Sequence, residues 1–372
     1  MATARFNNQM NKKQKEQKDH KHAHGQYFTT NQKYILQNLS IPNNIVNIIE
    51  PFAGNADLLQ FIEEENHEEN HEEKSKYTIE CFDIEPKRDF IVKRDTIQNP
   101  PVYENKFIIT NPPYLARNKS KDKQLFDKYD VNDLYKCFMK EILSNKAMGG
   151  IIIIPLNFWS SIRKADIELR KAFLDIYDIV HLNIFEEQVF DDTTTTVCSF
   201  QFNVKAPNKM TNNTIPISIY PTNVKISTIL NDANNYMIGG EIYNLKTKKH
   251  YKISRLTSKN QSIRNTNILV KCIDDNENSK IGLSFVNDAD LYIDETPNQS
   301  ARTYCTLIIE PSITIETQQK IVEQFNTFLE SNRTKYHSLF LTNYRESKDI
   351  ARKRISFDLV YQIVEYILDG ME

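Results

Sequence analysis

The side chains best placed for chemistry are four that directly follow the apolar run Phe107–Thr110, namely Asn111, Pro112, Pro113 and Tyr114. A short apolar run predicts a buried strand, and the residues just past the end of such a strand open into a crevice. The side-chain oxygen of Asn111 and the carbonyl oxygen of Pro112 are acceptors that can draw the hydrogens of a planar amino group out of plane and free its lone pair. Tyr114 adds a flat face on which an extruded base can stack. A strand end with a Pro-Pro turn is the alternative.

A glycine-containing turn lies upstream, between a predicted strand at residues 45–49 and a predicted helix from Leu58 to about Glu65. Glycine in such a turn lets backbone N–H groups and a helix N-terminus come close to a nucleotide-like ligand. Ala56 stands where such turns often carry a second glycine, which makes a pyrophosphate-binding turn a poorer interpretation. A turn that serves only packing is the alternative. The segment reads Glu50, Pro51, Phe52, Ala53, Gly54, Asn55, Ala56, Asp57.

Two carboxylates follow the next two predicted strands. The strand at residues 78–82 ends in Asp83, at an offset from the turn where an acidic side chain grips ribose hydroxyls. A third strand at residues 90–92 leads to Asp95, whose carboxylate can accept a hydrogen bond from an adenine amino group. For Asp95, an exposed loop acid is the alternative.

In their order along the chain, these residues resemble the gamma class of DNA adenine-N6 methyltransferases. A cofactor motif precedes the glycine turn in that class, and Gly25–Thr30, with the sequence Gly-Gln-Tyr-Phe-Thr-Thr, is similar to it. Residues 133–138 are similar to the motif V helix of the family, and residues 149–155 are similar to its fifth strand. The resemblance spans residues 25 to about 204.

The resemblance implies S-adenosylmethionine as cofactor and double-stranded DNA as substrate, with methyl transfer to N6 of a flipped adenine. It further implies a role in restriction and modification, beside a cognate restriction endonuclease that need not be bound. Phe190 is similar to the aromatic residue that packs on the flipped base, and Glu50 to the acid at the methionine end of the cofactor. The cofactor-binding residues that it implies are Tyr27, Phe28, Thr29, Glu50, Pro51, Gly54, Asp83, Asp95 and Asn111.

Short apolar strands alternate with helical segments through residue 175, which predicts a mostly parallel α/β sheet covered on both faces. The apolar runs at residues 179–184 and 195–202 have no helix between them, so we expect an antiparallel hairpin at one edge of the sheet. The resemblance implies the seven-stranded methyltransferase sheet, which is Rossmann-like. We expect a disordered basic tail at residues 1–24, a catalytic domain at 25–204 with an acidic insertion at 63–76, and a C-terminal α+β domain at 205–372 that recognises the DNA target.

The net charge of −2 over 372 residues conceals local differences. Seven acids between Glu63 and Glu73 leave the remainder of the chain net positive. Basic residues gather in the C-terminal half among Tyr, Asn and Gln, a mix that can hold phosphates and reach base edges, although such clusters also serve simply to solvate a surface. They are Lys246, Lys248, Lys249, Lys252, Arg255, Lys259, Arg264, Arg345, Lys348, Arg352, Lys353 and Arg354.

The five cysteines are single and widely spaced, which predicts structural thiols rather than a metal site. The histidines between His20 and His24 lie in a polar tail, so no metal is expected there. No apolar run approaches the ~18–20 residues of a membrane span, and the first 24 residues do not resemble a signal peptide. We expect the protein to be a monomer, not to be secreted and to have no membrane partner. Its expected location is the cytoplasm of a bacterium, or viral or host DNA.

Three other functions remain open, and a fourth, methylation of cytosine N4, is disfavoured. Methyltransferases acting on adenine in RNA share the chemistry, and protein glutamine methyltransferases use the same four-residue motif because a carboxamide nitrogen poses the same electronic problem. In the glutamine enzymes, however, a helical region precedes the glycine turn, whereas here the additional domain follows. Enzymes that methylate cytosine N4 usually begin the motif with Ser or Asp, so Asn111 favours adenine. A catalytically idle DNA-binding subunit is the last possibility, favoured only by Ala56.

Overall fold

The computed structural model describes residues 29, 31–69, 76–191, 193, 195–206, 214–274, 280–295, 303–343 and 352–371. The expected tail at residues 1–24 therefore lies outside the described residues, as do Tyr27, Phe28 and part of the acidic insertion. The chain divides into two units, one formed by Met1–Phe158 with Arg163–Ile229 and the other by Trp159–Ile162 with Leu230–Glu372.

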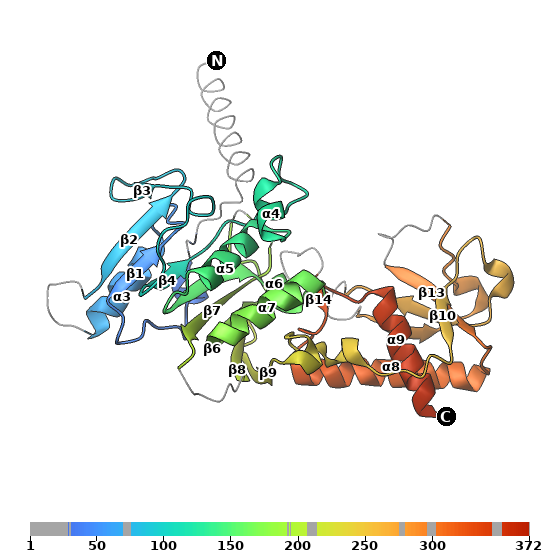
Figure 1. Cartoon of the computed structure of the whole chain (residues 1–372). Helices are drawn as coiled ribbons and strands as arrows, with labels where there is room; N and C mark the ends of the chain where they lie inside the picture. The colour runs from blue at the N-terminus through green and yellow to red at the C-terminus, as the bar shows by residue number, and fades with distance from the viewer. Residues whose placement is uncertain are drawn as a thin grey trace, which may run out of the picture. The chain divides into compact units, whose positions relative to one another are not determined.

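One nine-stranded sheet, in the order β3-β2-β1-β4-β5-β7-β6-β8-β9, forms the centre of the first unit (Figure 1). Strands β1 to β5 run parallel, and β7 is antiparallel to both β5 and β6. The mostly parallel α/β sheet predicted from the sequence is confirmed. The bounds are β1 Asn47–Glu50, β2 Thr78–Asp83, β3 Val92–Lys93, β4 Phe107–Thr110, β5 Gly149–Pro155, β6 Tyr177–Phe185, β7 Val197–Val204, β8 Thr214–Tyr220 and β9 Val224–Ile229.

The expected count of seven strands is wrong, because β8 and β9 extend the sheet beyond residue 204. Strand β8 pairs in parallel with β6, and β9 pairs antiparallel with β8. The sequence predicts that the hairpin of β6 and β7 forms an edge of the sheet. This prediction is wrong, because β8 and β9 lie beyond β6. Ile215, Ile217 and Ile219 of β8 alternate in the sequence and are buried, but Pro216 between them is typical of a strand break.

Helices cover both faces of this sheet. The crossover from β1 to β2 runs in the opposite direction along the sheet from the crossovers of β4 to β5 and β5 to β6. Since such crossovers are right-handed, α3 lies on one face and α5 and α7 on the other. Figure 1 shows α5 and α7 side by side, and a buried ion pair of 2.7 Å between Lys136 Nζ and Asp166 Oδ1 joins them. The helices are α2 Gln32–Ile35, α3 Leu59–Glu69, α4 Gln124–Tyr129, α5 Leu134–Ser144, α6 Asn157–Ser160 and α7 Lys164–Ile176.

The second unit contains a four-stranded antiparallel sheet in the order β10-β13-β11-β12. Its strands are β10 Lys252–Arg255, β11 Ile268–Lys271, β12 Gly282–Phe285 and β13 Tyr304–Glu310, and its long helices are α8 Ile315–Tyr336 and α9 Phe357–Met371. Helix α8 is joined to β12 because the Asn326 carboxamide exchanges two hydrogen bonds of 2.9 Å with the backbone of Leu283. A short ribbon of β14 Thr342–Asn343 and β15 Lys353–Arg354 completes the unit, with 3-10 turns at Asp232–Asn234, Gly240–Asn244, Gln261–Ile263 and Asp288–Asp290.

All five cysteines are buried and free, as expected of structural thiols. Within the described ranges, no three or more His, Cys, Asp and Glu side chains come together in a way that could hold a metal ion. None of the helices in those same ranges combines the length and the apolar character that crossing a membrane requires.

Candidate active site

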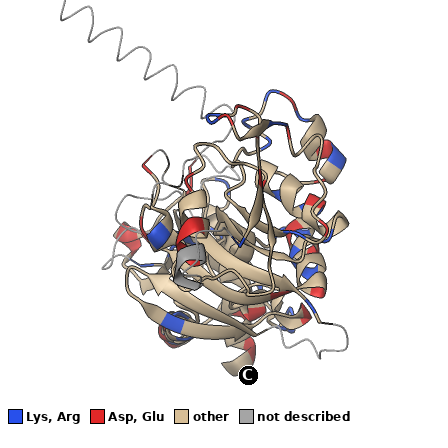
Figure 2. Ribbon diagram, turned by 90° about the vertical axis from the view of Figure 1, so that its left-hand side faces the viewer, with Lys and Arg blue, Asp and Glu red and all other residues tan. Residues whose placement is uncertain are grey.

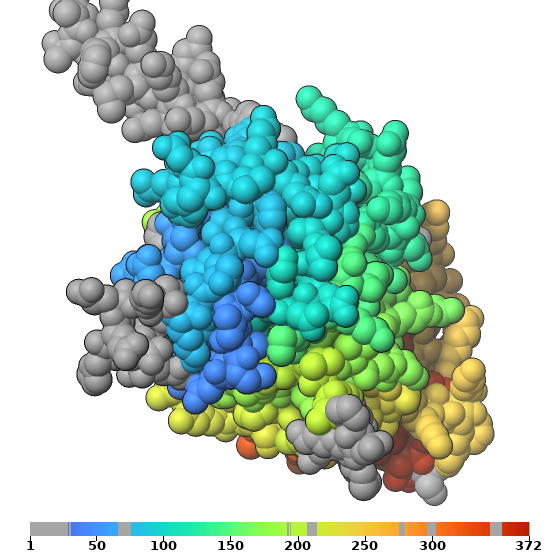
Figure 3. Space-filling view, turned by 60° about the vertical axis from the view of Figure 1, so that its left-hand side comes forward, coloured from blue at the N-terminus to red at the C-terminus, as the bar shows by residue number. Residues whose placement is uncertain are grey.

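A cavity of about 560 Å³ lies at the carboxyl ends of the parallel strands in the first unit. Glu50 ends β1, Asp83 ends β2 and Asn111 follows β4, and these three strands are neighbours in the sheet. The cavity thus lies where the strand order reverses, which is where open α/β sheets bind ligands. In Figure 3 the light-blue to cyan surface of the segment after β2 adjoins the teal to green surface of the segment after β4, and both segments line the cavity.

The Asn111 carboxamide is held at both of its polar atoms. Its Nδ2 donates to Thr29 Oγ1 at 3.1 Å, and its Oδ1 lies 2.5 Å from the hydroxyl of Tyr114. Thr29, which belongs to the Gly25–Thr30 segment, thus contacts the residue after β4 although 82 positions separate the two. Both Asn111 and Thr29 line the cavity. The orientation of the carboxamide is therefore fixed before any ligand binds.

Tyr114 is buried beside Asn111. Its hydroxyl is also 2.8 Å from the Ile153 carbonyl oxygen, and its ring packs edge-on against Tyr135 at 6.2 Å. Neither Tyr114 nor Phe190, whose side chain is only 2% exposed, lines the cavity. The stacking faces assigned to these two rings are covered in this structure, and their contact with a flipped base remains a prediction. Pro113 lines the cavity and Pro112 does not.

Glu50 forms a buried acidic site in the cavity wall. Its side chain is 1% exposed, and its Oε2 atom has no hydrogen-bond partner within the described residues. Burial raises the pKa of this carboxyl well above its ordinary value, and the nearby carboxylates of Asp57 and Asp83 raise it further. A buried carboxyl of this kind stays protonated unless a positively charged group nearby stabilises its ionised form.

Two further carboxylates are held by backbone N–H groups. Asp83 accepts from Gly54 N at 2.8 Å through Oδ2 and from Glu85 N at 2.7 Å through Oδ1. Asp95 accepts through Oδ1 from the backbone N–H groups of Ile97 at 3.1 Å and Gln98 at 3.0 Å. A carboxylate oxygen has more than one acceptor position, so both side chains keep acceptor capacity toward the cavity.

Pro51 contacts a residue of the cavity wall without lining the cavity itself. Its carbonyl oxygen accepts a hydrogen bond of 2.9 Å from the Thr96 hydroxyl. This bond ties the turn after β1 to the loop that carries Asp95. The resemblance implies that Pro51 contacts the cofactor, and this contact remains a prediction; in the structure its carbonyl oxygen holds Thr96, which lines the cavity.

The turn after β1 keeps the backbone shape of a glycine turn although one glycine is replaced. Gly54 has φ +54°, and Ala56 has φ +69° in the left-handed region that glycine tolerates and other residues rarely adopt. The replacement therefore costs stability but does not open the turn.

We expect Ala56→Gly to raise the free energy of unfolding by about 1 kcal/mol, because glycine removes the left-handed strain at this position. The change is measured as the shift in the urea midpoint at constant slope. Ala53→Gly is the matched control, since Ala53 is buried and its φ is not positive, and it should destabilise the protein. An equal loss of stability in both variants would contradict the strain at Ala56.

Sequence reasoning missed the apolar walls of the cavity, which include Phe52, Ile84, Ile97, Leu125 and Phe126. Phe52 also packs edge-on against Phe138 at 5.1 Å. The signal for Phe52 was its place inside the glycine turn. The other four have no local pattern that separates them from core residues.

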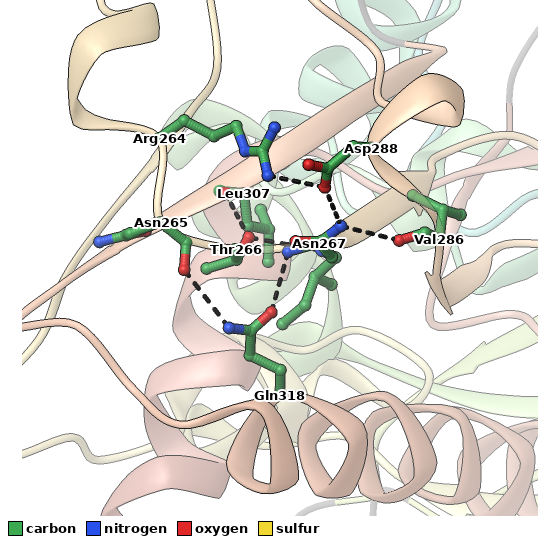
Figure 4. Close-up of polar contacts among 9 residues, drawn as sticks. Arg264, Asn265, Thr266, Asn267, Val286, Asp288, Leu307 and Gln318 are labelled. Atoms are coloured by element: carbon green, nitrogen blue, oxygen red, sulfur yellow. Dashed lines mark hydrogen bonds and ion pairs between the residues drawn. The ribbon is translucent and has the colours of Figure 1, made fainter.

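Several basic residues of the second unit form ion pairs or are buried. Arg255 lies 3.1 Å from Asp294, Lys252 lies 3.4 Å from Glu310, and Lys353 is buried. Figure 4 shows Arg264 and Asn267 both directed at the Asp288 carboxylate, with 2.7 Å between Arg264 and Asp288. Arg345 and Lys348 lie outside the described residues. Among the described residues of this unit, the exposed basic residues that form no ion pair include Lys246, Lys249 and Lys259.

Neither a family model nor a curated protein sequence matches this chain. Among solved structures, it is similar to a modification subunit of a putative type I restriction enzyme from Vibrio vulnificus (11% identity, TM-score 0.41, 52% of this chain and 47% of the other). It is also similar to a putative class I S-adenosylmethionine-dependent methyltransferase from Listeria monocytogenes (11%, 0.37, 50% and 61%) and to the type IIG restriction endonuclease BpuSI (13%, 0.40, 63% and 36%). The chain spans about half the length of the first structures that it matches.

Proposed function

We propose that this protein is an S-adenosylmethionine-dependent methyltransferase that acts on N6 of adenine in double-stranded DNA. The observation that carries the proposal is the position of Asn111. Its carboxamide follows β4 and faces a cavity whose other walls present the carboxylates of Glu50, Asp83 and Asp95. An acceptor for an amino group and a set of acceptors for a cationic nucleoside thus share one cavity.

The carboxylates fit S-adenosylmethionine in their chemistry. The unpaired Oε2 of Glu50 suits the ammonium group of the methionine part, and Asp83 suits the ribose hydroxyls. Asp95 suits the adenine amino group, with Ile84, Ile97 and other apolar residues available to pack on the ring. When bound, this cofactor supplies a methyl group already activated by a sulfonium. The protein then has to position the acceptor and exclude water rather than supply a strong base.

Asn111 and Pro112 would orient the acceptor amine. The Asn111 oxygen that would accept from this amine now lies against the Tyr114 hydroxyl. When an amine takes that place, the hydroxyl loses one of its two acceptors, and the Tyr114 ring becomes able to turn a face toward the base. Phe190 would pack on the opposite face of the base.

We expect Tyr114→Phe to retain kcat/KM for DNA within a few fold, because the ring stays and only the hydroxyl is lost. Tyr114→Ala should lose about 5-fold to 150-fold, the equivalent of ~1–3 kcal/mol of stacking on one base. Initial rates at subsaturating DNA measure both variants. If the Phe variant loses as much as the Ala variant, the hydroxyl rather than the ring face is what the reaction needs.

The biological role that we propose is protection of DNA from a cognate restriction endonuclease, in the cytoplasm of a bacterium or on viral DNA. The second unit would supply target recognition, through residues that include the exposed lysines named above. Binding of the endonuclease is not required for this role.

The direct test uses the purified full-length protein with tritium-labelled S-adenosylmethionine and three acceptors: duplex DNA, structured RNA and a protein with exposed glutamine. Label is expected in the DNA only, and nucleoside analysis should place it on adenine N6. Transfer to RNA or protein alone would replace the proposed substrate. Cofactor binding in calorimetry without transfer to any acceptor would identify an idle subunit.

A further inference from the structure

A basic loop directly follows the Asn-Pro-Pro-Tyr motif and forms part of the cavity wall. Between Arg117 and Lys123 the sequence carries four basic residues and a single acid, Asp122. Lys119, Ser120, Lys121 and Asp122 line the cavity together with Asn111, whereas Lys123 does not. Positive charge therefore lines the same cavity as the predicted acceptor site, within the first unit itself.

The backbone of this loop is held in place by its own hydrogen bonds. The N–H of Lys119 donates to the Ala116 carbonyl at 2.8 Å, and the hydroxyl of Ser120 donates to the Asp122 carbonyl at 2.5 Å. The N–H of Arg117 donates to the Asn132 carbonyl at 2.9 Å, which joins the loop to the start of α5. The loop is thus an ordered support for the side chains that it carries.

Three of its basic residues are available for a ligand. Arg117 is paired with Asp127 at 2.7 Å. Lys119, Lys121 and Lys123 are exposed, and no ion pair joins them to another residue that the structure describes. A lysine in this state is a mobile point charge, suited to a phosphate oxygen that approaches from solvent.

The cavity is divided by charge. Glu50 and Asp83 are buried at the strand ends, while Lys119 and Lys121 are exposed on the loop. Arg94 also lines the cavity, but its guanidinium donates to the carbonyl oxygens of Asn99 and Pro100 and so is already engaged. Figure 2 shows acidic and basic residues interspersed along the ribbon, so this separation is a local property of the cavity.

We propose that Lys119 and Lys121 bind the backbone phosphates that flank the nucleotide whose base enters the cavity. This inference rests on the proposed function and names the part of the substrate that the loop recognises. A base can enter the cavity only if its phosphates come to the rim, where Lys119 and Lys121 are exposed beside one acid, Asp122, and form no ion pair with a described residue. Phosphate contacts of this kind fix the position of the nucleic acid without reading its sequence.

The test compares three single variants of the full-length protein, Lys119→Gln, Lys121→Gln and Lys123→Gln. Lys123 is the matched control, because it lies on the same loop and carries the same charge but does not line the cavity. KM for duplex DNA is measured between 50 and 200 mM salt, and the dissociation constant for S-adenosylmethionine is measured by calorimetry.

Each of the first two variants should raise KM for DNA about threefold to tenfold and reduce the slope of log KM against log salt by about 1, with cofactor affinity unchanged. The control should change neither KM nor slope. Equal effects of all three variants would mean that the loop attracts DNA only through its net positive charge. Weaker cofactor binding in the Lys119 and Lys121 variants would mean that these lysines bind the cofactor and not the DNA. Either outcome overturns the inference. If the unaltered protein methylates no DNA, the proposed function has failed instead.

Discussion

Asn111→Ala is expected to lower kcat for methyl transfer by about 10²-fold to 10³-fold, the loss typical when one positioned polar group of an active site is removed. The dissociation constant for S-adenosylmethionine should change by less than about threefold, equivalent to ~0.7 kcal/mol. The reason lies in the position of the side chain, which contacts Thr29 and Tyr114, whereas the carboxylates proposed to hold the cofactor form other walls of the cavity. Single-turnover rates and calorimetry measure the two quantities separately.

The fold should tolerate this change. The Tyr114 hydroxyl keeps the Ile153 carbonyl oxygen as an acceptor at 2.8 Å, so no buried donor is left without a partner. Asn118→Ala is the matched control, because Asn118 is exposed on the loop after the motif and does not line the cavity. It should leave both rate and affinity unchanged. If cofactor affinity falls in parallel with the rate in Asn111→Ala, Asn111 holds the cofactor rather than the acceptor.

Glu50→Gln is expected to weaken S-adenosylmethionine binding by at least about tenfold and at the same time to stabilise the protein without ligand. Loss of a buried charged partner costs a ligand roughly 2–5 kcal/mol of binding free energy, which is why we expect weaker cofactor binding of this size. In the absence of ligand, Glu50→Gln is expected to raise the free energy of unfolding. The carboxyl has a raised pKa, so its ionised form destabilises the folded state, and this loss of stability grows as the pH rises from the ordinary glutamate value toward the raised one.

The pH dependence gives Glu50→Gln a clear readout. Thermal melts at pH 8 should show the variant above the unaltered protein, with the difference vanishing below the ordinary glutamate pKa, where Glu50 is protonated in both the folded and unfolded states. An ammonium group favours the ionised carboxyl, so cofactor binding should release a proton below the raised pKa in the unaltered protein but not in the variant. Calorimetry in buffers of different ionisation enthalpy counts this proton.

Glu80→Gln serves as the control for Glu50→Gln. Glu80 lies on the neighbouring strand β2, is partly exposed and forms an ion pair of 2.6 Å with Lys106 outside the cavity. Such a pair contributes at most about 1 kcal/mol, and its loss should leave cofactor affinity unchanged. Unchanged cofactor affinity in Glu50→Gln would remove Glu50 from the proposed site.

The central strands could be predicted because both of their faces are buried. Strands β4 and β5 occupy the predicted residues, since parallel strands buried on both faces are continuous apolar runs. Strand β3 begins at Val92 rather than at residue 90, and Phe90 is exposed. Strand β3 is an edge strand of two residues, and its bounds depend on which residues pair with β2. The apolar pattern of the sequence does not contain this information.

The positions of the candidate residues followed from chain order, whereas their orientations did not. Residues at the ends of adjacent parallel strands must lie close together, and Glu50, Asp83 and Asn111 line one cavity for that reason. The directions of Tyr114 and Phe190 depend on packing against residues distant in the sequence. Ion pairing has the same limit, because Asp288 and Asp294 cannot be matched to Arg264 and Arg255 without the fold.

The central claim is that Asn111 holds an adenine amino group for methylation. It is tested most directly by single-molecule sequencing of genomic DNA from cells that express either the unaltered chain or Asn111→Ala. The account predicts N6-methyladenine in one short sequence context with the unaltered chain and none with the variant at equal expression. A genome without modified adenine, or the same modification with both chains, would contradict it.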